Sequence, residues 1–287
     1  MNILLTLDRN YLAPLRVLLT SLFVNNPGEH FDLYVAGDGF MQADHDLIEK
    51  LYARFGSAYH PIDIDESWFS DAPTLRYYSR AMYYRLLAAQ LLPEDLDRVL
   101  YLDPDMLITG PIRPLYETRM GENLYAACIH KGLMDLSTPV NKIRLSAYES
   151  EGYFNSGMLL MNLPAIRASV RPQDIFDYVR ENRALLILPD QDVLNGLYGE
   201  RILALEEQLY NYDVRKYREY LLLSSGEHDK QWVMENTVIL HFCGKRKPWH
   251  DSSRGRFSML YRHYMQLAAR YAQQASPLRA HRDERSL

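Results

Sequence analysis

The feature that most limits how this chain can fold is an apolar stretch at residues 98–108 that contains two carboxylates. Residues 99–102 predict a buried strand, and Asp103 and Asp105 follow at its carboxyl end. Two like charges beside an apolar strand raise each other's pKa unless a cation lies between them, and a divalent metal ion suits that position. Pro104 stiffens the turn between them. Taken alone, the segment fits a solvated turn better, so a metal site needs support from other residues.

Strand and helix patterns alternate through the first part of the chain. Short apolar runs at 2–7, 31–36 and 58–62 predict strands. Apolar residues at helical spacing predict a helix after each of the first two strands, the first with Asn10 as its N-cap, and a further single helix over 81–91. This alternation predicts an α/β fold, a single Rossmann-like domain with a mixed, mainly parallel sheet flanked by helices. Ligands of such sheets bind beyond the carboxyl ends of the strands.

Composition narrows the class of protein. The 287 residues include 47% apolar residues, enough for a large core, and the net charge of −5 argues against a protein whose whole surface binds nucleic acid. Cys128 and Cys243 lie far apart without CxxC spacing, which indicates a reducing compartment and no zinc site. The first residues lack a basic segment typical of signal peptides, and no apolar run reaches the roughly 20 residues that span a bilayer. We therefore expect a cytoplasmic protein whose contact with a membrane, if any, is peripheral.

A second strand exit carries the residues that support a metal site. Residues 238–242 predict a strand that includes His241, and Gly244 and the cationic residues 245–247 follow it. Two aspartates and a histidine suit Mn²⁺, whereas Mg²⁺ is less favoured by an imidazole ligand. Gly244 lets backbone N–H groups approach a ligand closely, and the cations can neutralise a diphosphate. Together with Asp103 and Asp105, these residues predict a site for a metal and a diphosphate.

Two common phosphate-binding motifs are missing from the sequence. No GxxxxGK[ST] occurs, which argues against phosphate transfer on a P-loop. No GxGxxG follows the first strand, which argues against a dinucleotide cofactor. A sugar-nucleotide pyrophosphorylase is also disfavoured, because no glycine-rich loop follows Leu7.

Four motifs, in order, carry a resemblance to a known family. They are Asp103-Pro104-Asp105, Phe154-Asn155-Ser156-Gly157, Asp190-Gln191-Asp192, and the segment 241–249 that begins with His241-Phe242-Cys243-Gly244. From residue 2 to about residue 249 the chain resembles glycosyltransferase family 8, which includes bacterial lipopolysaccharide galactosyl- and glucosyltransferases and the glycogenins. The resemblance implies a GT-A fold, UDP-glucose or UDP-galactose as donor, Mn²⁺, and retention of the anomeric configuration.

The resemblance also implies roles for single residues. Asp103, Asp105 and His241 match the metal ligands of the family. Lys247 matches the lysine that reaches the diphosphate, with Gly244 in the same turn. The resemblance implies that uracil and ribose are held by Leu7, Asp8, Asn10 and Tyr11. It implies that Arg85 lies near the donor sugar and phosphates and that Pro104 lies within the donor-binding turn. The catalytic set around the transferred sugar would be Asp190, Gln191 and Asn155.

Structural roles are alternatives for several of these residues. Asp190 and Gln191 could cap a helix, and Asp192 stands where a helix dipole favours an acid in any protein. Asn155 could satisfy backbone groups at the start of a strand. Arg85 could be a structural ion-pair partner, because a single Arg on a helix usually faces water.

The resemblance implies a retaining, Mn²⁺-dependent transferase that moves a hexose, glucose or galactose, from a UDP-sugar to a glycan or glycolipid. Negative charge would grow on the leaving diphosphate near the metal and Lys247, and positive charge on the sugar near Asp190, Gln191 and Asn155. An amide at Gln191 is no strong nucleophile, so we expect front-face transfer without a covalent intermediate. The alternative is a priming protein that glycosylates itself, or a protein that binds a sugar nucleotide without transferring the sugar.

The domain organisation follows from the extent of these patterns. We expect a GT-A catalytic domain at 1–250, an amphipathic helical appendage at 251–275 and a basic, disordered tail at 276–287. The cationic face of the helix allows contact with anionic lipid, but docking of the helix on the protein's own core is the preferred interpretation. We expect the acceptor to be recognised by loops at 65–79 and 130–151, whose residues do not identify it, and no oligomeric state is predicted.

Overall fold

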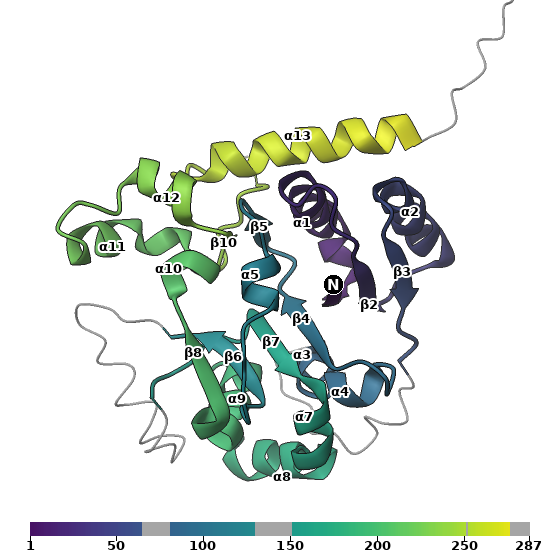
Figure 1. Cartoon of the computed structure of the whole chain (residues 1–287), viewed down its shortest axis with the longest axis vertical. Helices are drawn as coiled ribbons and strands as arrows, with labels where there is room; N and C mark the ends of the chain where they lie inside the picture. Colours follow the sequence, from purple (N-terminus) through teal and green to yellow (C-terminus); the bar gives the residue numbers. More distant parts are fainter. Residues whose placement is uncertain (65–80, 130–150, 251, 276–287) are drawn as a thin grey trace, which may run out of the picture.

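The protein is built on a seven-stranded sheet, seen in a computed structural model that describes residues 1–64, 81–129, 151–250 and 252–275 (Figure 1). The strands of this sheet are β1 (Asn2–Asp8), β2 (Asp32–Asp38), β3 (Ala58–Pro61), β4 (Arg98–Leu102), β6 (Tyr125–Cys128), β7 (Met158–Asn162) and β8 (Ile202–Leu205). They lie in the order β3-β2-β1-β4-β7-β6-β8. Of the six neighbouring pairs, four are parallel, and only the two pairs that contain β7 are antiparallel. The predicted α/β fold with a mixed, mainly parallel sheet is confirmed.

Helices cover both faces of the sheet. The α-helices are α1 (Leu12–Asn25), α2 (Gln42–Tyr52), α3 (Ala81–Leu86), α4 (Ala88–Leu91), α5 (Arg113–Tyr116), α7 (Leu163–Ser169), α8 (Pro172–Asn182), α9 (Pro189–Tyr198), α10 (Glu207–Tyr210), α11 (Tyr217–Leu223), α12 (Lys230–Asn236) and α13 (Ser258–Ala275). The 3-10 turns are η1 (Arg9–Tyr11), η2 (Ala53–Phe55), η4 (Gly199–Arg201) and η5 (Val214–Lys216).

The side chains of β1 point alternately to the two faces of the sheet, and this explains why helices must pack on both faces. Ile3 and Leu5 belong to the core that contains α1 and α2, whereas Leu4 belongs to the core that contains α3 and α9. All three side chains are fully buried. Successive side chains of a strand point to opposite faces, so a strand that is apolar throughout must lie between two layers of helices.

A second, three-stranded sheet lies beside the main one and was not expected from the sequence. It is formed by β5 (Met106–Ile108), β10 (Ile239–His241) and β9 (Tyr212–Asp213), in the order β5-β10-β9. The apolar stretch at 98–108 therefore supplies two strands, β4 in the main sheet and β5 in the second. The turn between these strands contains both carboxylates.

Two local predictions were wrong. Asp8, not Asn10, caps the first helical segment: its carboxylate accepts a hydrogen bond from the backbone N–H of Asn10 at 2.8 Å, which begins η1 ahead of α1. An N-cap requires an extended backbone, and Asp8, at φ −87° and ψ 165°, has it as the last residue of β1. The predicted helix at 81–91 is divided into α3 and α4 at Leu87, which leaves helical geometry while its side chain stays buried.

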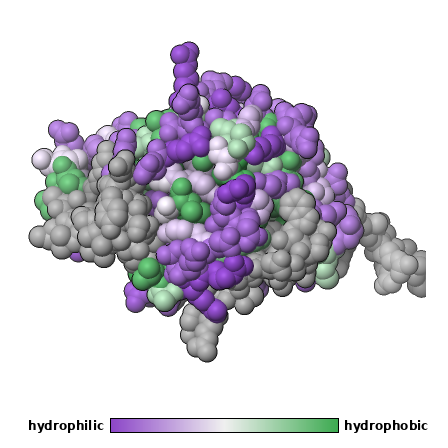
Figure 2. All heavy atoms as spheres, turned by 90° about the horizontal axis from the view of Figure 1, so that it is seen from below, coloured by the Kyte–Doolittle hydropathy of each residue, from purple (hydrophilic) through white to green (hydrophobic). Residues whose placement is uncertain are grey.

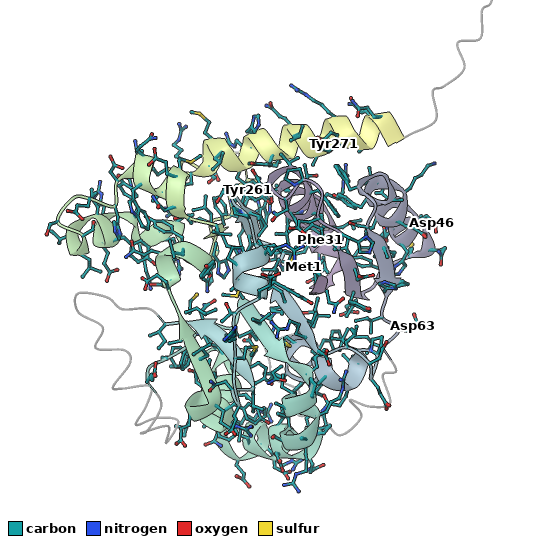
Figure 3. All side chains as sticks on the ribbon, viewed as in Figure 1. Met1, Phe31, Asp46, Asp63, Tyr261 and Tyr271 are labelled. Carbon is teal, nitrogen blue, oxygen red and sulfur yellow. The ribbon has the colours of Figure 1, made fainter. Side chains whose placement is uncertain are left out.

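The C-terminal helix α13 lies across α1 and α2 (Figure 1). Tyr261 and Tyr271 are on the side of α13 that faces these helices (Figure 3), and Tyr261 is fully buried. The side-chain amide of Asn25 in α1 donates a hydrogen bond to the hydroxyl of Tyr264 at 2.8 Å. The apolar face of α13 is thus packed on the protein. The predicted division at residue 250 stays a prediction, and residues 276–287 lie outside the described chain.

One face of the molecule is mostly hydrophilic among the described residues. On the face seen in Figure 2, hydrophilic residues dominate among the described atoms, and the hydrophobic patches are small and separate. Among the described residues, no helix has an apolar stretch long enough to cross a bilayer.

Candidate functional site

The two carboxylates of the turn after β4 are held in place by backbone hydrogen bonds. The N–H of Asp103 donates to the carbonyl of Gly157 at 2.8 Å, which ties the turn to the segment before β7. The carbonyl of Asp105 accepts the N–H of Phe242 at 3.1 Å, which ties it to the exit of β10. Three chain segments that are far apart in sequence therefore meet at this turn.

Pairing between β5 and β10 brings His241 to the aspartates. His241 stands opposite Met106 in this antiparallel ladder, one residue from Asp105. Its Nε2 atom lies 3.2 Å from a carboxylate oxygen of Asp105 and 3.9 Å from one of Asp103. One ligand atom from each of the three residues lies within 4.8 Å of the other two. The structure thus brings together all three predicted metal ligands.

Asn211 fixes the orientation of the imidazole and was missed by sequence reasoning. Its Oδ1 accepts a hydrogen bond from Nδ1 of His241 at 2.7 Å, which leaves Nε2 directed at the carboxylates. Its Nδ2 donates to Oδ1 of Asn155 at 2.8 Å. Asn211 precedes β9, the edge strand of the small sheet, and nothing in the sequence around it predicts that position.

Two cations neutralise the aspartates. Nη1 of Arg85 lies 3.0 Å from Asp103 and 3.1 Å from Asp190, so the guanidinium bridges two acids. Nζ of Lys247 contacts the carboxylate of Asp105 and donates to the carbonyl of Phe242 at 3.1 Å. The side chains of Arg85 and Lys247 are only 14% and 13% exposed, so solvent screens these ion pairs weakly.

Burial and the neighbouring charges raise the pKa of Asp103 and lower the pKa of Asp105. Burial raises the pKa of Asp103, and Arg85 only partly offsets the rise. Burial also opposes ionisation of Asp105, but His241 and Lys247 outweigh it and hold the pKa of that carboxyl below its usual range. Burial lowers the pKa of His241, yet Cys243 and Asp105 reverse the shift and raise it above the ordinary value.

The donor set fits a divalent metal ion. Two carboxylates and an imidazole nitrogen, with ligand atoms within 4.8 Å of one another, are the mixture that Mn²⁺ accepts. Gly157 lies so close to His241 and Asp103 that a single added methyl group would displace these side chains. A Cβ atom on Gly157 would lie 2.5 Å from Cε1 of His241 and 2.8 Å from Oδ2 of Asp103. Only glycine leaves this space free.

Polar residues from two segments lie next to the predicted metal-ligand group, which consists of Asp103, Asp105 and His241. Pro189 opens α9, which places Asp190 and Gln191 in its first turn. The hydroxyl of Ser156 donates to Asp190 at 2.9 Å, and Nδ2 of Asn155 donates to Oε1 of Gln191 at 3.1 Å. The predicted sugar-binding residues therefore lie together, connected to His241 through Asn211 and Asn155.

Asp192, to which the sequence assigned no role, is fully buried and supports the start of α9. Its carboxylate accepts the hydroxyl of Tyr153 at 2.5 Å and the backbone N–H groups of Ile187 and Leu188 at 2.6 and 3.0 Å. Two of these partners lie in the turn that precedes α9. Its contacts fix the start of the helix that carries Asp190.

A cleft of about 300 Å³ opens at the carboxyl ends of β1 and β4. Asn10 and Gly244 of the predicted donor set do not line this cleft: the side chain of Asn10 is exposed, and Gly244 faces Arg215. The predicted acceptor loops at 65–79 and 130–151 fall almost wholly outside the described residues. The cleft is lined by Thr6, Leu7, Asp8, Tyr11, Arg85, Asp103, Pro104, Asp105 and Lys247.

Comparisons with known proteins agree with this arrangement. Residues 2–253 match the family described as Glycosyl transferase family 8. The chain is 31% identical over 255 residues to the lipopolysaccharide 1,2-glucosyltransferase of Escherichia coli K12, covering 87% of this chain and 73% of that protein. It is 26% identical over 252 residues to the lipopolysaccharide 1,3-galactosyltransferase of Salmonella typhimurium, with the same two coverages.

A solved structure of the galactosyltransferase LgtC, in complex with donor and acceptor sugar analogues, is similar over 93% of this chain and 96% of that one. The identity is 26% and the TM-score is 0.77, which confirms the expected GT-A fold. The family match covers the main sheet, the metal-ligand group and the cleft. This chain therefore belongs to glycosyltransferase family 8.

Proposed function

We propose that this glycosyltransferase transfers glucose or galactose from a UDP-sugar to a glycan or glycolipid acceptor, with Mn²⁺ as its metal and with retention of the anomeric configuration. One observation carries the proposal. A pair of carboxylates, a lysine and an arginine line a cleft at the carboxyl ends of the strands, and an imidazole lies beside the carboxylates. A metal-bound diphosphate in this cleft would be neutralised from several sides.

The lining of the cleft supports a direction for the donor. Leu7, Asp8 and Tyr11 at the exit of β1 form the end that we assign to uracil and ribose. Lys247 lies at the end that we assign to the diphosphate. Tyr11 stands edge-on to Trp249, two residues after Lys247, with ring centroids 6.0 Å apart.

Asp103, Asp105 and His241 would hold the metal. Mn²⁺ suits this donor set better than Mg²⁺, which disfavours imidazole. When bound, such an ion supplies positive charge that stabilises the leaving diphosphate. Lys247 adds a second positive charge, and its contacts with Asp105 and the carbonyl of Phe242 hold the ammonium group ready before the donor binds.

On the sugar side, Asp190, Gln191 and Asn155 supply carboxylate and amide oxygens around a developing oxocarbenium ion. Asp190 is paired with Arg85 and hydrogen-bonded by Ser156, and both contacts reduce its strength as a nucleophile. Gln191 carries an amide. We therefore favour front-face transfer, in which an oxygen of the leaving phosphate takes the acceptor proton. A stable glycosyl adduct on Asp190, trapped from native donor and detected by mass spectrometry, would contradict this mechanism.

The relatives favour an acceptor from the cell envelope. Two of them are named as lipopolysaccharide glycosyltransferases, one a glucosyltransferase and one a galactosyltransferase, so the donor hexose is open between these two. Peripheral association with the inner face of the membrane would bring the enzyme to such an acceptor. The cationic face of α13 would contact the anionic lipids.

The test is metal-dependent release of hexose from UDP-glucose and UDP-galactose. We expect Mn²⁺ to support release, a chelator to abolish it, and the Asp103→Asn/Asp105→Asn double variant to lose it while keeping its fold by circular dichroism. The matched control Asp46→Asn/Asp95→Asn removes two exposed acids far from the cleft and should behave as wild type. Hexose added to the protein itself, seen by intact mass, would favour the self-glycosylating alternative. Release that persists in the Asp103/Asp105 double variant would refute the metal assignment.

A further inference from the structure

Residues 153–156, which precede β7, lie along the first turns of α9 and are hydrogen-bonded to it at every position. Three of these contacts join two side chains: Tyr153 to Asp192, Asn155 to Gln191 and Ser156 to Asp190. The fourth contact is made by Asn195, whose side chain binds the backbone of Phe154. Asn195 lies outside the sequence motifs that predicted the site.

The amide of Asn195 is engaged on both its oxygen and its nitrogen. Its Oδ1 accepts the backbone N–H of Phe154 at 2.7 Å. Its Nδ2 donates to the carbonyl of Phe154 at 2.8 Å and to the carbonyl of Gln191 at 2.7 Å. Exchange of both a donor and an acceptor with one residue is the pattern of an antiparallel strand pair, and an amide side chain can reproduce it. Because both carbonyls can only accept, a single orientation of the amide satisfies all three contacts.

These contacts lie in the interior of the protein. Asn195 is 1% exposed, and Phe154 is fully buried in the core that also contains Val193 and Leu194. Breaking any contact of a buried amide leaves a donor or an acceptor unpaired, which is costly away from water. Asn195 therefore fixes the distance between the backbone of residue 154 and α9.

Asn195 completes a ring of contacts that begins and ends at Asp103. The N–H of Asp103 donates to the carbonyl of Gly157, in the segment before β7. The carboxylate of Asp103 contacts Arg85, which also contacts Asp190 in the first turn of α9. The segment and the helix are thus each tied to Asp103 separately, and Asn195 joins them to each other through the backbone.

The side-chain contacts between the segment and α9 are less suited to this task. Asn155, Gln191 and Asp190 are the residues that we assign to the transferred sugar, and a sugar hydroxyl bound there competes with the contacts that they make to each other. Asn195 binds only backbone groups, so its contacts persist with or without a sugar.

We propose that Asn195 is a positioning residue for sugar transfer: it holds Asn155 at the distance from Gln191 and Asp190 that the transferred sugar requires. This inference rests on the proposed function, because it concerns the residues assigned to that sugar. A displacement of reacting groups by about 1 Å can lower a rate by roughly 100-fold. Loss of the Asn195 contacts should therefore slow the chemical step.

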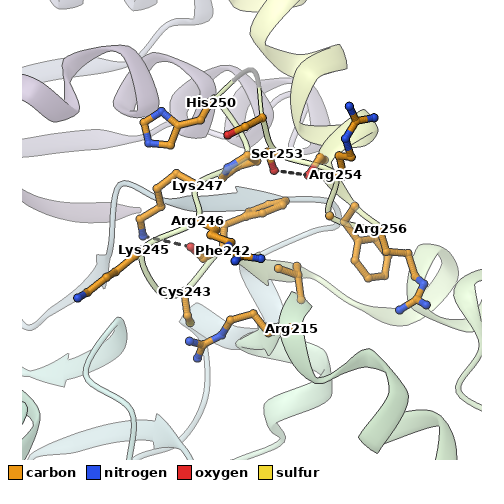
Figure 4. A pocket seen from close by; sticks show the side chains of 16 residues that line it. Arg215, Phe242, Cys243, Lys245, Arg246, Lys247, His250, Ser253, Arg254 and Arg256 are labelled. Carbon is orange, nitrogen blue, oxygen red and sulfur yellow. Dashed lines mark hydrogen bonds between the residues drawn. The ribbon is translucent and has the colours of Figure 1, made fainter.

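The diphosphate end of the donor cleft is held without Asn195. Nζ of Lys247 donates to the carbonyl of Phe242 within the loop after β10 (Figure 4), and it contacts the carboxylate of Asp105. Asn195 is not among the described residues that line the cleft. Binding of UDP, which carries no sugar, should therefore be independent of Asn195, and it separates a positioning role from a general collapse of the site.

The test is Asn195→Leu, which removes all three hydrogen bonds with little change in side-chain size. We expect kcat for Mn²⁺-dependent hexose release from UDP-glucose or UDP-galactose to fall by roughly 100-fold. The donor KM and the affinity for UDP should stay within about threefold of wild type, because the lost positioning acts in the transition state. Steady-state kinetics and calorimetric titration of UDP in the presence of Mn²⁺ measure these quantities.

Asn26→Leu is the matched control, because Asn26 makes the same set of contacts at the end of α1. Its Oδ1 accepts the N–H of Ile112 at 2.9 Å, and its Nδ2 donates to the carbonyl of Leu22, one turn back in α1, and to that of Gly110. Asn26 is 5% exposed and is not among the described lining of the cleft. Asn26→Leu should lower the thermal stability to a similar extent as Asn195→Leu, yet keep kcat within about twofold of wild type.

Asn195→Asp serves as the test if the leucine variant does not fold. Its carboxyl group keeps an acceptor for the N–H of Phe154 but loses at least one of the two donations to carbonyls. We expect a fall in kcat of about tenfold, with Asn26→Asp as its control.

Three results would overturn the proposal. Wild-type kcat in the Asn195 variants would show that the sugar-binding residues need no such support. An equal fall of kcat in the Asn26 and Asn195 variants would assign the effect to lowered stability. A loss of UDP affinity in the Asn195 variants as large as the loss of kcat would mean that the whole cleft had collapsed. Failure of the proposed function would be seen separately, as absence of Mn²⁺-dependent hexose release by wild type.

Discussion

The imidazole of His241 donates from Nδ1 to Oδ1 of Asn211 at 2.7 Å, and this contact decides which ring nitrogen faces Asp103 and Asp105. With Nδ1 engaged as a donor, Nε2 is the atom available to a metal. The amide of Asn211 is itself oriented by Asn155, because its Nδ2 donates to that side chain at 2.8 Å. The predicted metal ligands and the predicted sugar-binding residues are thus joined by a continuous chain of side-chain hydrogen bonds.

Asn211→Leu should weaken Mn²⁺ binding by about 10- to 100-fold, because the imidazole loses the acceptor that fixes its orientation. Titration of Mn²⁺ followed by electron paramagnetic resonance measures this affinity directly. Asn236→Ala, at the exposed end of α12, is the control and should leave it unchanged. Wild-type affinity in Asn211→Leu would show that the histidine needs no such support.

Gly157→Ala tests the space between the ligands. Its methyl group would come within 2.5 Å of His241 and 2.8 Å of Asp103, closer than atoms tolerate, so at least one ligand must move. We expect Mn²⁺ binding and donor turnover to fall by about 100-fold or more, with a smaller loss of thermal stability. Gly110→Ala is the matched control, since its added methyl group would make only ordinary contacts with Val238 at 3.5 Å. Equal metal affinity in the two variants would contradict the crowding argument.

The fold and the grouping of Asp103, Asp105 and His241 were predictable because each has a local signal. Apolar runs marked the strands, and Asp103, Asp105 and His241 stand at or beside strand ends, where residues of this kind are informative. Asn211 has no such signal. Its position depends on the small second sheet, whose strands β5 and β9 have three and two residues and are too short to leave a periodic pattern.

The supporting role of Asp192 was hidden for another reason. An acid in the first turn of a helix is common in any protein, because the helix dipole favours it. Sequence alone could not distinguish that general preference from a fully buried carboxylate that accepts hydrogen bonds from Tyr153 and from two backbone N–H groups. Burial, which only the folded chain reveals, separates the two cases.

Arg85→Met should lower donor turnover by about 100-fold, since Asp103 and Asp190 would lose their shared cation and the cleft would lose a donor to the phosphates. Arg85→Lys keeps the charge, but its shorter side chain lacks the planar guanidinium that lies over the Tyr101 ring at 4.7 Å, so we expect partial recovery only. Steady-state kinetics with UDP-glucose and UDP-galactose measure both. Arg167→Met removes a structural arginine that donates to the carbonyls of Ala89 and Pro93, and should reduce stability without changing the donor KM. If Arg85→Met kept wild-type turnover, Arg85 would be structural.

The ion pair of Asp213 and Arg215 should make stability depend on pH. Burial raises the pKa of Asp213, but the hydrogen bonds from Arg215 outweigh it and hold the pKa below its usual range. A carboxyl with a lower pKa in the folded state stabilises the protein above its unfolded pKa and loses that contribution as pH falls through the folded value. Removing Arg215 with Arg215→Met should therefore lower the free energy of unfolding at about pH 7 and have much less effect at about pH 3. Urea unfolding at both pH values measures the difference, and an equal loss at both would refute the linkage.

Substitutions at Asp192 should separate the cost of lost charge from the cost of unpaired donors. In Asp192→Asn the amide oxygen can still accept the N–H groups of Ile187 and Leu188, and its NH₂ can donate to the hydroxyl of Tyr153, so we expect a loss of about 1 kcal/mol. Asp192→Ala leaves all three donors without this acceptor, for which we expect a loss of about 3 kcal/mol and a larger fall in turnover as Asp190 and Gln191 shift. Tyr153→Phe removes one of the three donors and should cost about 1 kcal/mol. Denaturant unfolding of the three variants gives the order. Equal losses for Asp192→Asn and Asp192→Ala would show that charge, and not the satisfaction of the two backbone groups, holds the start of α9.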